Sequence, residues 1–189
     1  KLELNDDEHI VLFGAHGADV DPNKGFDLLN DMMGHLSAIQ TSKPIRCLIF
    51  GNTKPGPRAF NNLPATYLGR LDNDQAIVQA YGAADLVIVP SRQENMPQVA
   101  TEAQSCGRPV VAFSTTGLVD AVKDGETGVL IPPFDTARGA HLIANLLEQP
   151  LELRRFGDLA RQRALSEWAP SVIAAAYESY FEEVIAHWS

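Results

Sequence analysis

Short apolar runs alternate with stretches of helical periodicity along most of this chain. Six runs are bounded by Gly, Pro or polar residues, which is typical of short strands. They cover residues 10–14, 45–51, 65–69, 86–90, 110–113 and 128–131. Parallel strands buried on both faces are almost continuously apolar, as these runs are. The pattern predicts an α/β fold with a doubly wound parallel sheet and ligands at the carboxyl ends of its strands.

Helices are expected between and after these strands. Phe26, Leu29, Met33 and Leu36 recur at helical spacing, which predicts a helix from Gly25 to about Gln40. Further helices are predicted over 72–81, from Pro97 onward, from near Asp135, and over 151–167 and 170–188. Residues 51–62, rich in Gly, Pro and Asn, predict a surface loop.

Composition limits the possible classes of protein. The 189 residues suffice for one well-buried domain, 1–189, and not for two of ordinary size. No apolar run approaches the roughly 20 residues that cross a bilayer, and the N-terminus does not resemble a signal peptide. Cys47 and Cys106 lack metal-ligand spacing and are expected to be buried thiols in a reducing compartment. A net charge of −9 argues against nucleic acid as a partner.

Two glutamates, Glu94 and Glu102, carry the candidate chemistry. Glu94 lies in the loop after a predicted strand, and Glu102 lies roughly 7.5 Å along the helix expected to begin at Pro97, because proline favours the first helical position. Met96 is a poor N-cap, so the backbone amides at this helix start stay available to an anion. A phosphate there would have one carboxylate towards each end, as a sugar–diphosphate–ribose requires. Each glutamate alone could equally be an ordinary residue at a helix start.

The surrounding segments extend this pattern. The spacing resembles the Glu-x7-Glu motif of retaining glycosyltransferases of the GT-B fold, above all family 4. Residues 102–112, 116–122, 124–130 and 133–135 resemble the segments that follow it in that family. The resemblance runs from about Ile10 to the C-terminus. It implies one half of a GT-B fold, the C-terminal, donor-binding half of a longer two-domain enzyme, with 170–189 as its terminal helix.

The resemblance also implies roles for single residues. Lys24 would neutralise the donor's diphosphate, Glu94 would face the transferred sugar, and Glu102 would accept hydrogen bonds from the ribose. The expected substrate-binding set is Gly14, Arg70, Leu71, Asn95, Met96, Pro97, Gln98, Val99 and Glu102. Within it, the amides of Gln98 and Val99 would meet the phosphates. Arg70 and Leu71 lie in the segment that corresponds to the family's base-binding loop.

One family feature is missing. An arginine that commonly precedes the lysine is absent: Ala15 and His16 follow Gly14. His16 and Arg92 are candidate substitutes, but the sequence favours neither. Lys24 and Arg70 could also be ordinary surface residues.

Two further motifs match known ligand sites only in part. Asp19-Val20-Asp21 matches a metal-binding motif of another glycosyltransferase fold, but its place before Pro22 favours a turn. We therefore expect metal independence and no cofactor. Gly14 and Gly17 form an incomplete dinucleotide motif, which is a weak signal.

The sequence thus predicts a retaining glycosyltransferase domain that binds a UDP-, GDP- or ADP-sugar. The resemblance implies an acceptor sugar or lipid-linked glycan, bound through the other domain, and a role in surface polysaccharide synthesis. A cytoplasmic protein is expected, with a peripheral position at the inner face of the membrane left open. An epimerase of GT-B architecture and a non-catalytic nucleotide-sugar-binding module remain alternatives.

Overall fold

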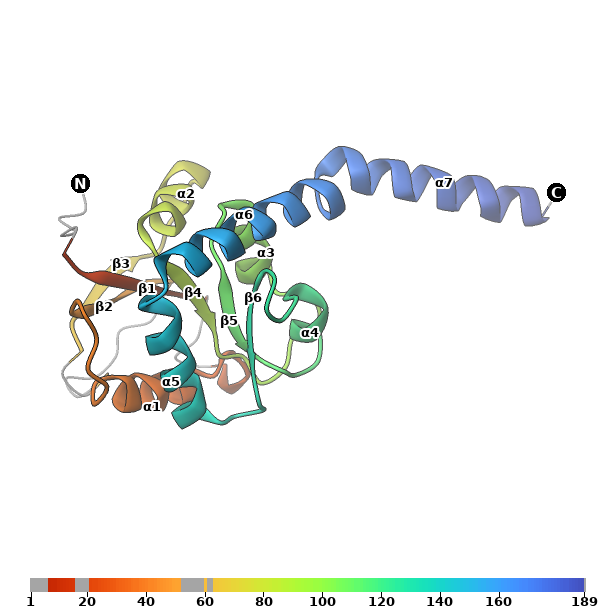
Figure 1. Ribbon diagram of the computed structural model, residues 1–189. Helices are drawn as coiled ribbons and strands as arrows, with labels where there is room; N and C mark the ends of the chain where they lie inside the picture. Colours follow the sequence, from red (N-terminus) through yellow and green to blue (C-terminus); the bar gives the residue numbers. More distant parts are fainter. Residues whose placement is uncertain (1–6, 16–20, 52–59, 61–62, 189) are drawn as a thin grey trace.

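The computed structural model describes residues 7–15, 21–51, 60 and 63–188. In this part of the chain, six parallel strands form one sheet in the order β3-β2-β1-β4-β5-β6 (Figure 1). They are β1 (His9–Ala15), β2 (Ile45–Gly51), β3 (Ala65–Gly69), β4 (Leu86–Val89), β5 (Val110–Phe113) and β6 (Gly128–Ile131). The predicted runs therefore match the strands to within one residue at either end, which confirms the predicted fold class.

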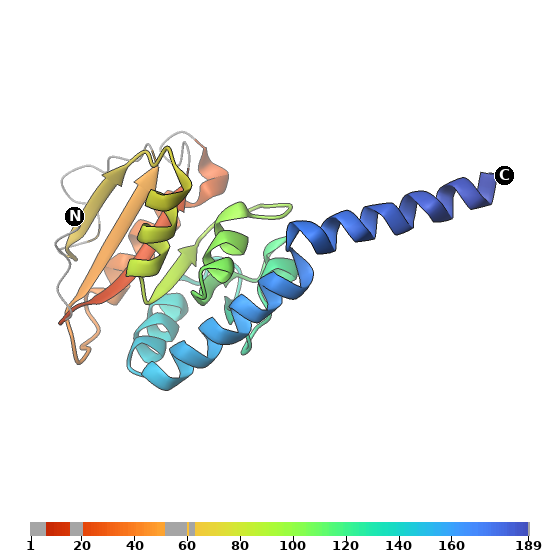
Figure 2. The ribbon, with the colours of Figure 1, turned by 90° about the horizontal axis from the view of Figure 1, so that it is seen from above.

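Helices cover both faces of the sheet (Figure 2). Successive strand residues face opposite sides, so Val11 and Phe13 of β1 join one core while Ile10 and Leu12 join the other. The first core packs against α1 (Phe26–Leu36), α5 (Thr136–Leu147) and part of α6 (Pro150–Glu167). The second packs against α2 (Asp74–Ala83), α3 (Gln98–Ser105) and the short α4 (Leu118–Ala121).

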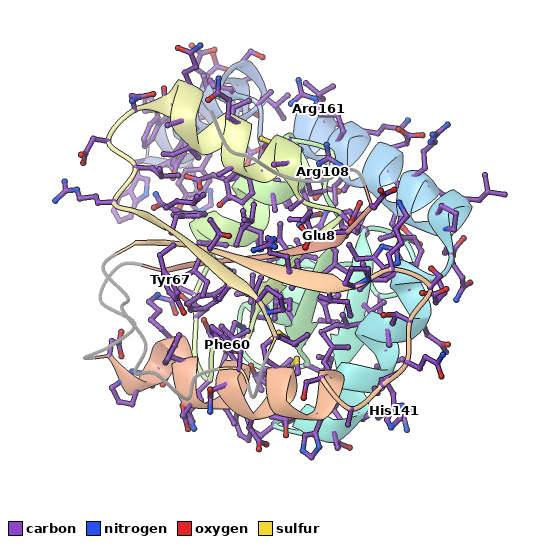
Figure 3. All side chains as sticks on the ribbon, turned by 90° about the vertical axis from the view of Figure 1, so that its left-hand side faces the viewer. Glu8, Phe60, Tyr67, Arg108, His141 and Arg161 are labelled. Carbon is purple, nitrogen blue, oxygen red and sulfur yellow. The ribbon has the colours of Figure 1, made fainter. Side chains whose placement is uncertain are left out.

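An aromatic cluster closes the first core beside α1. Phe60 is buried, and its ring meets that of Phe26 edge to face at 6.0 Å. The Phe60 amide donates to Asn30 Oδ1 of α1. Figure 3 shows Phe60 between the sheet and this helix. The remainder of the predicted 51–62 loop lies outside the described residues, apart from Gly51 at the end of β2.

Helix starts differ slightly from the predictions, for local reasons. Pro97 has an extended backbone (ψ 115°), so it is the N-cap of α3 and the helix begins at Gln98. Asn73 caps α2 by accepting from the Ala76 amide, and Asp72 pairs instead with Arg70. The first helix ends at Leu36, earlier than Gln40. A 3-10 helix, η1 (Pro22–Lys24), precedes it.

The last helix, α7 (Pro170–Trp188), projects away from the sheet (Figure 1). None of the residues 170–188 is buried. Its exposed large hydrophobic residues are Val172, Ile173, Tyr177, Tyr180, Phe181, Val184, Ile185 and Trp188. Among the described residues, no helix combines the length and the apolar character needed to span a bilayer.

Both cysteines are free thiols. Burial raises the pKa of Cys47 to about 12, which keeps it protonated. Cys106 is only half-buried, so the prediction of a buried thiol is correct for Cys47 alone.

Candidate functional site

The candidate site lies at the carboxyl ends of β1 and β4, where the strand order changes direction. Ligands of doubly wound folds bind at such a point. A cavity of about 410 Å³ opens there. Its lining comprises Phe13, Gly14, Lys24, Val89, Pro90, Ser91, Glu94, Met96, Pro97, Gln98 and Val99. Seven of these eleven are residues that the sequence nominated: Gly14, Lys24, Glu94, Met96, Pro97, Gln98 and Val99.

Lys24 reaches the cavity because η1 turns the chain back towards β4. Gly25 ends this turn with φ of 65°, a left-handed conformation that suits glycine. A Cβ on Gly25 would lie 2.0 Å from the Pro90 carbonyl oxygen. Lys24 Nζ is 2.8 Å from Glu94 Oε1, with the two side chains 32% and 15% exposed. The cation and the carboxylate assigned to different parts of the donor therefore meet in one ion pair.

The Glu94 loop is held by the turn after β5. The Glu94 amide donates to Thr116 Oγ1 at 3.0 Å, and the Gly117 amide donates to the Glu94 carbonyl at 2.9 Å. A Cβ on Gly117 would fall 1.5 Å from the Asn95 carbonyl oxygen. The close approach of two backbones thus fixes Glu94, and it depends on the absence of a side chain at 117.

The start of α3 faces the same cavity. No side chain caps this helix end, and the first amide with a partner in the described structure is that of Ala100, which donates to Pro97. The amides of Gln98 and Val99 are left without an acceptor among the described residues. Free amides and the helix dipole make this end attractive to an anion.

Glu102 follows one turn later on α3, four residues after Gln98 and three after Val99, so it lies on the same side of the helix. It is half-buried and does not itself line the cavity. Its Oε2 accepts a hydrogen bond of 2.9 Å from the Tyr81 hydroxyl. No motif in the sequence pointed to this tyrosine, because the contact joins two helices.

Arg92 stabilises the turn that carries Lys24. Its guanidinium donates to both carboxylate oxygens of Asp27 and to the Pro22 carbonyl, and its amide donates to the Asn23 carbonyl. The hydrogen bonds from Arg92 hold the pKa of Asp27 below its usual value. Arg92 is thus engaged away from the cavity. His16, the other candidate for the missing arginine, lies outside the described residues.

Besides Glu102, three nominated residues do not line this cavity in the described structure. Arg70 pairs with Asp72 at 2.6 Å on an exposed loop, and Leu71 packs against the second core. Asn95 is exposed, with its carbonyl against Gly117. Phe13, Val89, Pro90 and Ser91 line it without having been nominated. The sequence could have pointed to them, since all four stand at or beside the carboxyl ends of predicted strands, where ligands of such folds bind.

Only the last residue of the Asp19-Val20-Asp21 motif belongs to the described part of the chain. Asp19 and Val20, like Gly17, lie outside the described residues, while Asp21 caps η1 by accepting from the Asn23 amide. That is the turn chemistry predicted for this segment. Among the described residues, no group of three or more His, Cys, Asp or Glu side chains could hold a metal ion.

Known proteins share both the sequence and the fold. A D-inositol 3-phosphate glycosyltransferase of Segniliparus rotundus is 35% identical over 168 residues, which cover 83% of this chain and 36% of that protein. Its counterpart in Nocardia farcinica is 36% identical over 169 residues, covering 83% and 37%. The chain thus spans about a third of the length of these curated relatives.

Solved structures of other proteins share the fold of this chain. A sucrose-phosphate synthase of Thermosynechococcus elongatus has a TM-score of 0.81 and 28% identity, covering 98% of this chain and 48% of that one. Anabaena HepE, in complex with UDP-glucose, has a TM-score of 0.77 at 22% identity and covers 94% and 49%; at this identity it shows the fold alone. The model of the family "Glycosyl transferases group 1" matches residues 8–149. The chain therefore belongs to the group 1 glycosyl transferases and has the Rossmann-like fold of a GT-B domain.

Proposed function

We propose that this chain is the donor-binding domain of a retaining, metal-independent glycosyltransferase that uses a nucleoside-diphosphate sugar. The observation that carries the proposal is a single cavity with Lys24, Glu94 and the free amides of Gln98 and Val99 around it. Cation and amides suit a diphosphate. Glu94 on one side and Glu102 on the other suit the hydroxyl-rich groups that a diphosphate joins.

Each group has a task in the proposed reaction. The amides at the start of α3 bind the phosphates, and Lys24 balances the charge that develops on the diphosphate as the glycosidic bond breaks. Glu94 contacts the transferred sugar. An acceptor hydroxyl attacks the face from which the diphosphate departs, and the leaving phosphate takes up its proton. This chemistry needs no protein nucleophile.

The acceptor, a sugar or lipid-linked glycan of a surface polysaccharide, would be held by another domain of a longer, cytoplasmic enzyme. The relatives named above act on D-inositol 3-phosphate by name, and a structural neighbour binds UDP-glucose. UDP is therefore the first nucleotide to test, ahead of GDP and ADP.

Glu102→Ala is expected to weaken nucleoside-diphosphate binding by about 1–3 kcal/mol, because one hydrogen-bonded charged group is lost. Titration calorimetry of the chain with UDP, GDP and ADP measures the effect, with Glu126→Ala as the control. Glu126 is exposed and lies at the amino end of the edge strand β6, whereas the cavity lies at the carboxyl ends of the central strands β1 and β4. If Glu102→Ala binds as tightly as the parent, Glu102 is not the ribose ligand.

Chelation is expected to leave nucleotide affinity and sugar transfer nearly unchanged. The charges assigned to the diphosphate here are a lysine and a helix end, neither of which needs a metal. The measurement compares calorimetric affinity, and transfer by the complete enzyme, with and without EDTA. Loss of activity restored by Mn²⁺ or Mg²⁺ would contradict metal independence and return Asp19 and Asp21 to consideration as ligands.

A further inference from the structure

Tyr81 is a buried residue whose hydroxyl bonds to Glu102, the residue assigned to the ribose. It lies on α2 and is fully buried, and its hydroxyl donates a hydrogen bond of 2.9 Å to Glu102 Oε2. A buried tyrosine hydroxyl needs a hydrogen-bond partner. Here the partner is a site residue on another helix, and the contact joins α2 to α3.

The Tyr81 ring is fixed from the sheet side. Phe50, near the end of β2, meets it edge to face with ring centroids 5.8 Å apart. The Phe50 ring in turn covers Gly14, where a Cβ would lie 2.1 Å from the ring. A glycine that lines the cavity, two aromatic rings and a carboxylate thus form a packed series. Since an aromatic side chain has only two rotatable bonds, the position of the hydroxyl is well defined.

The hydroxyl leaves half of the Glu102 carboxylate available. No described residue hydrogen-bonds to the other oxygen, Oε1. Burial, together with the negative charge of Glu102, raises the pKa of Tyr81, so the hydroxyl stays a donor at physiological pH. With Oε2 occupied, the carboxylate is held in one orientation with Oε1 as its open acceptor.

We propose that Tyr81 is a positioning residue that makes the site selective for ribonucleotides: it holds Glu102 so that Oε1 accepts from the ribose hydroxyls. This inference rests on the proposed function, in which Glu102 contacts the ribose. Selectivity follows because a carboxylate oriented to accept from a hydroxyl is left without its partner when that hydroxyl is missing.

The experiment compares UDP with 2′-deoxy-UDP, and GDP and ADP with their 2′-deoxy forms, by calorimetry on the chain and its Tyr81→Phe variant. For the base that the parent binds, the parent should prefer the ribonucleotide about tenfold. Tyr81→Phe should lose about 3- to 10-fold in affinity for the ribonucleotide and little for the deoxy form, because one hydrogen bond is removed. Tyr67→Phe, on the half-exposed edge strand β3 (Figure 3), should change neither.

A double variant tests the route of the effect. In a Glu102→Gln background, Tyr81→Phe should add little further loss, because both changes act on one contact. Equal losses for both sugars, full additivity, or no effect would overturn the proposal. So would loss of the fold in Tyr81→Phe, seen by circular dichroism, since the hydroxyl would then be a structural group. A parent that binds none of the three nucleotides would sink the proposed function itself, and the inference with it.

Discussion

Glu94→Gln is expected to lower the rate of sugar transfer by about 100- to 1000-fold, the scale for losing one preorganised group that stabilises transition-state charge. The amide keeps the shape of the side chain but removes the charge that faces the sugar. Affinity for the bare nucleoside diphosphate should stay the same or rise slightly, because Lys24 loses its partner at 2.8 Å and keeps its own charge. Steady-state kinetics of the complete enzyme and calorimetry with UDP measure the two quantities.

This split between rate and affinity distinguishes the role of Glu94 from that of Glu102. A contact that strengthens only in the transition state changes turnover and leaves ground-state binding alone. Glu126→Gln, which removes an exposed charge at the amino end of the edge strand β6, should change neither quantity. Lost affinity for the bare nucleotide with undiminished turnover at saturation would make Glu94 a nucleotide ligand, contrary to the assignment.

Gly117→Ala is expected to cost about 1–3 kcal/mol of stability, as overpacking does, and to lower transfer about 100-fold. The new methyl group would lie 1.5 Å from the Asn95 carbonyl oxygen and 2.9 Å from that of Glu94, so the loop that carries Glu94 must move. A displacement of about 1 Å near a reacting centre can cost about 100-fold in rate. Thermal unfolding and transfer assays measure both effects.

Gly82→Ala is the matched control for this change. Gly82 lies within α2, and a Cβ there meets nothing within 4 Å. Alanine favours helix over glycine, so this variant should be as stable as the parent or slightly more so. If Gly117→Ala keeps both stability and transfer, the close approach of the two loops does not hold Glu94 in place.

The inner strands of the sheet were predictable because they are buried on both faces. Runs such as 86–90 and 110–113 are continuously apolar, short and rich in β-branched residues, as buried parallel strands are. The helix start beside Pro97 was predictable from proline's fixed geometry, although the extended ψ of this residue moved the start to Gln98. Local chemistry therefore located both the strands and the uncapped helix end.

The contacts that hold the site together were not predictable. Thr116 reaches the Glu94 amide across 22 residues of sequence, and Tyr81 reaches Glu102 across 21. Such pairs depend on which loops and helices the strand order brings together. The periodicity of a single sequence carries no information on strand order. For the same reason Arg70 was nominated from its loop alone, whereas the structure pairs it with Asp72.

The two halves of the site come from opposite sides of the sheet's switch point. Lys24 follows β1 and Glu94 follows β4, and the chain between them builds β2, β3 and α2 before β4 returns to pair with β1 at Val11 and Leu86. A ligand that touches both residues binds only to the completed sheet. Its binding free energy then adds to the stability of the whole domain, by about 2.7 kcal/mol at a concentration 100 times its Kd. The folded fraction of this chain would then follow the supply of its own donor.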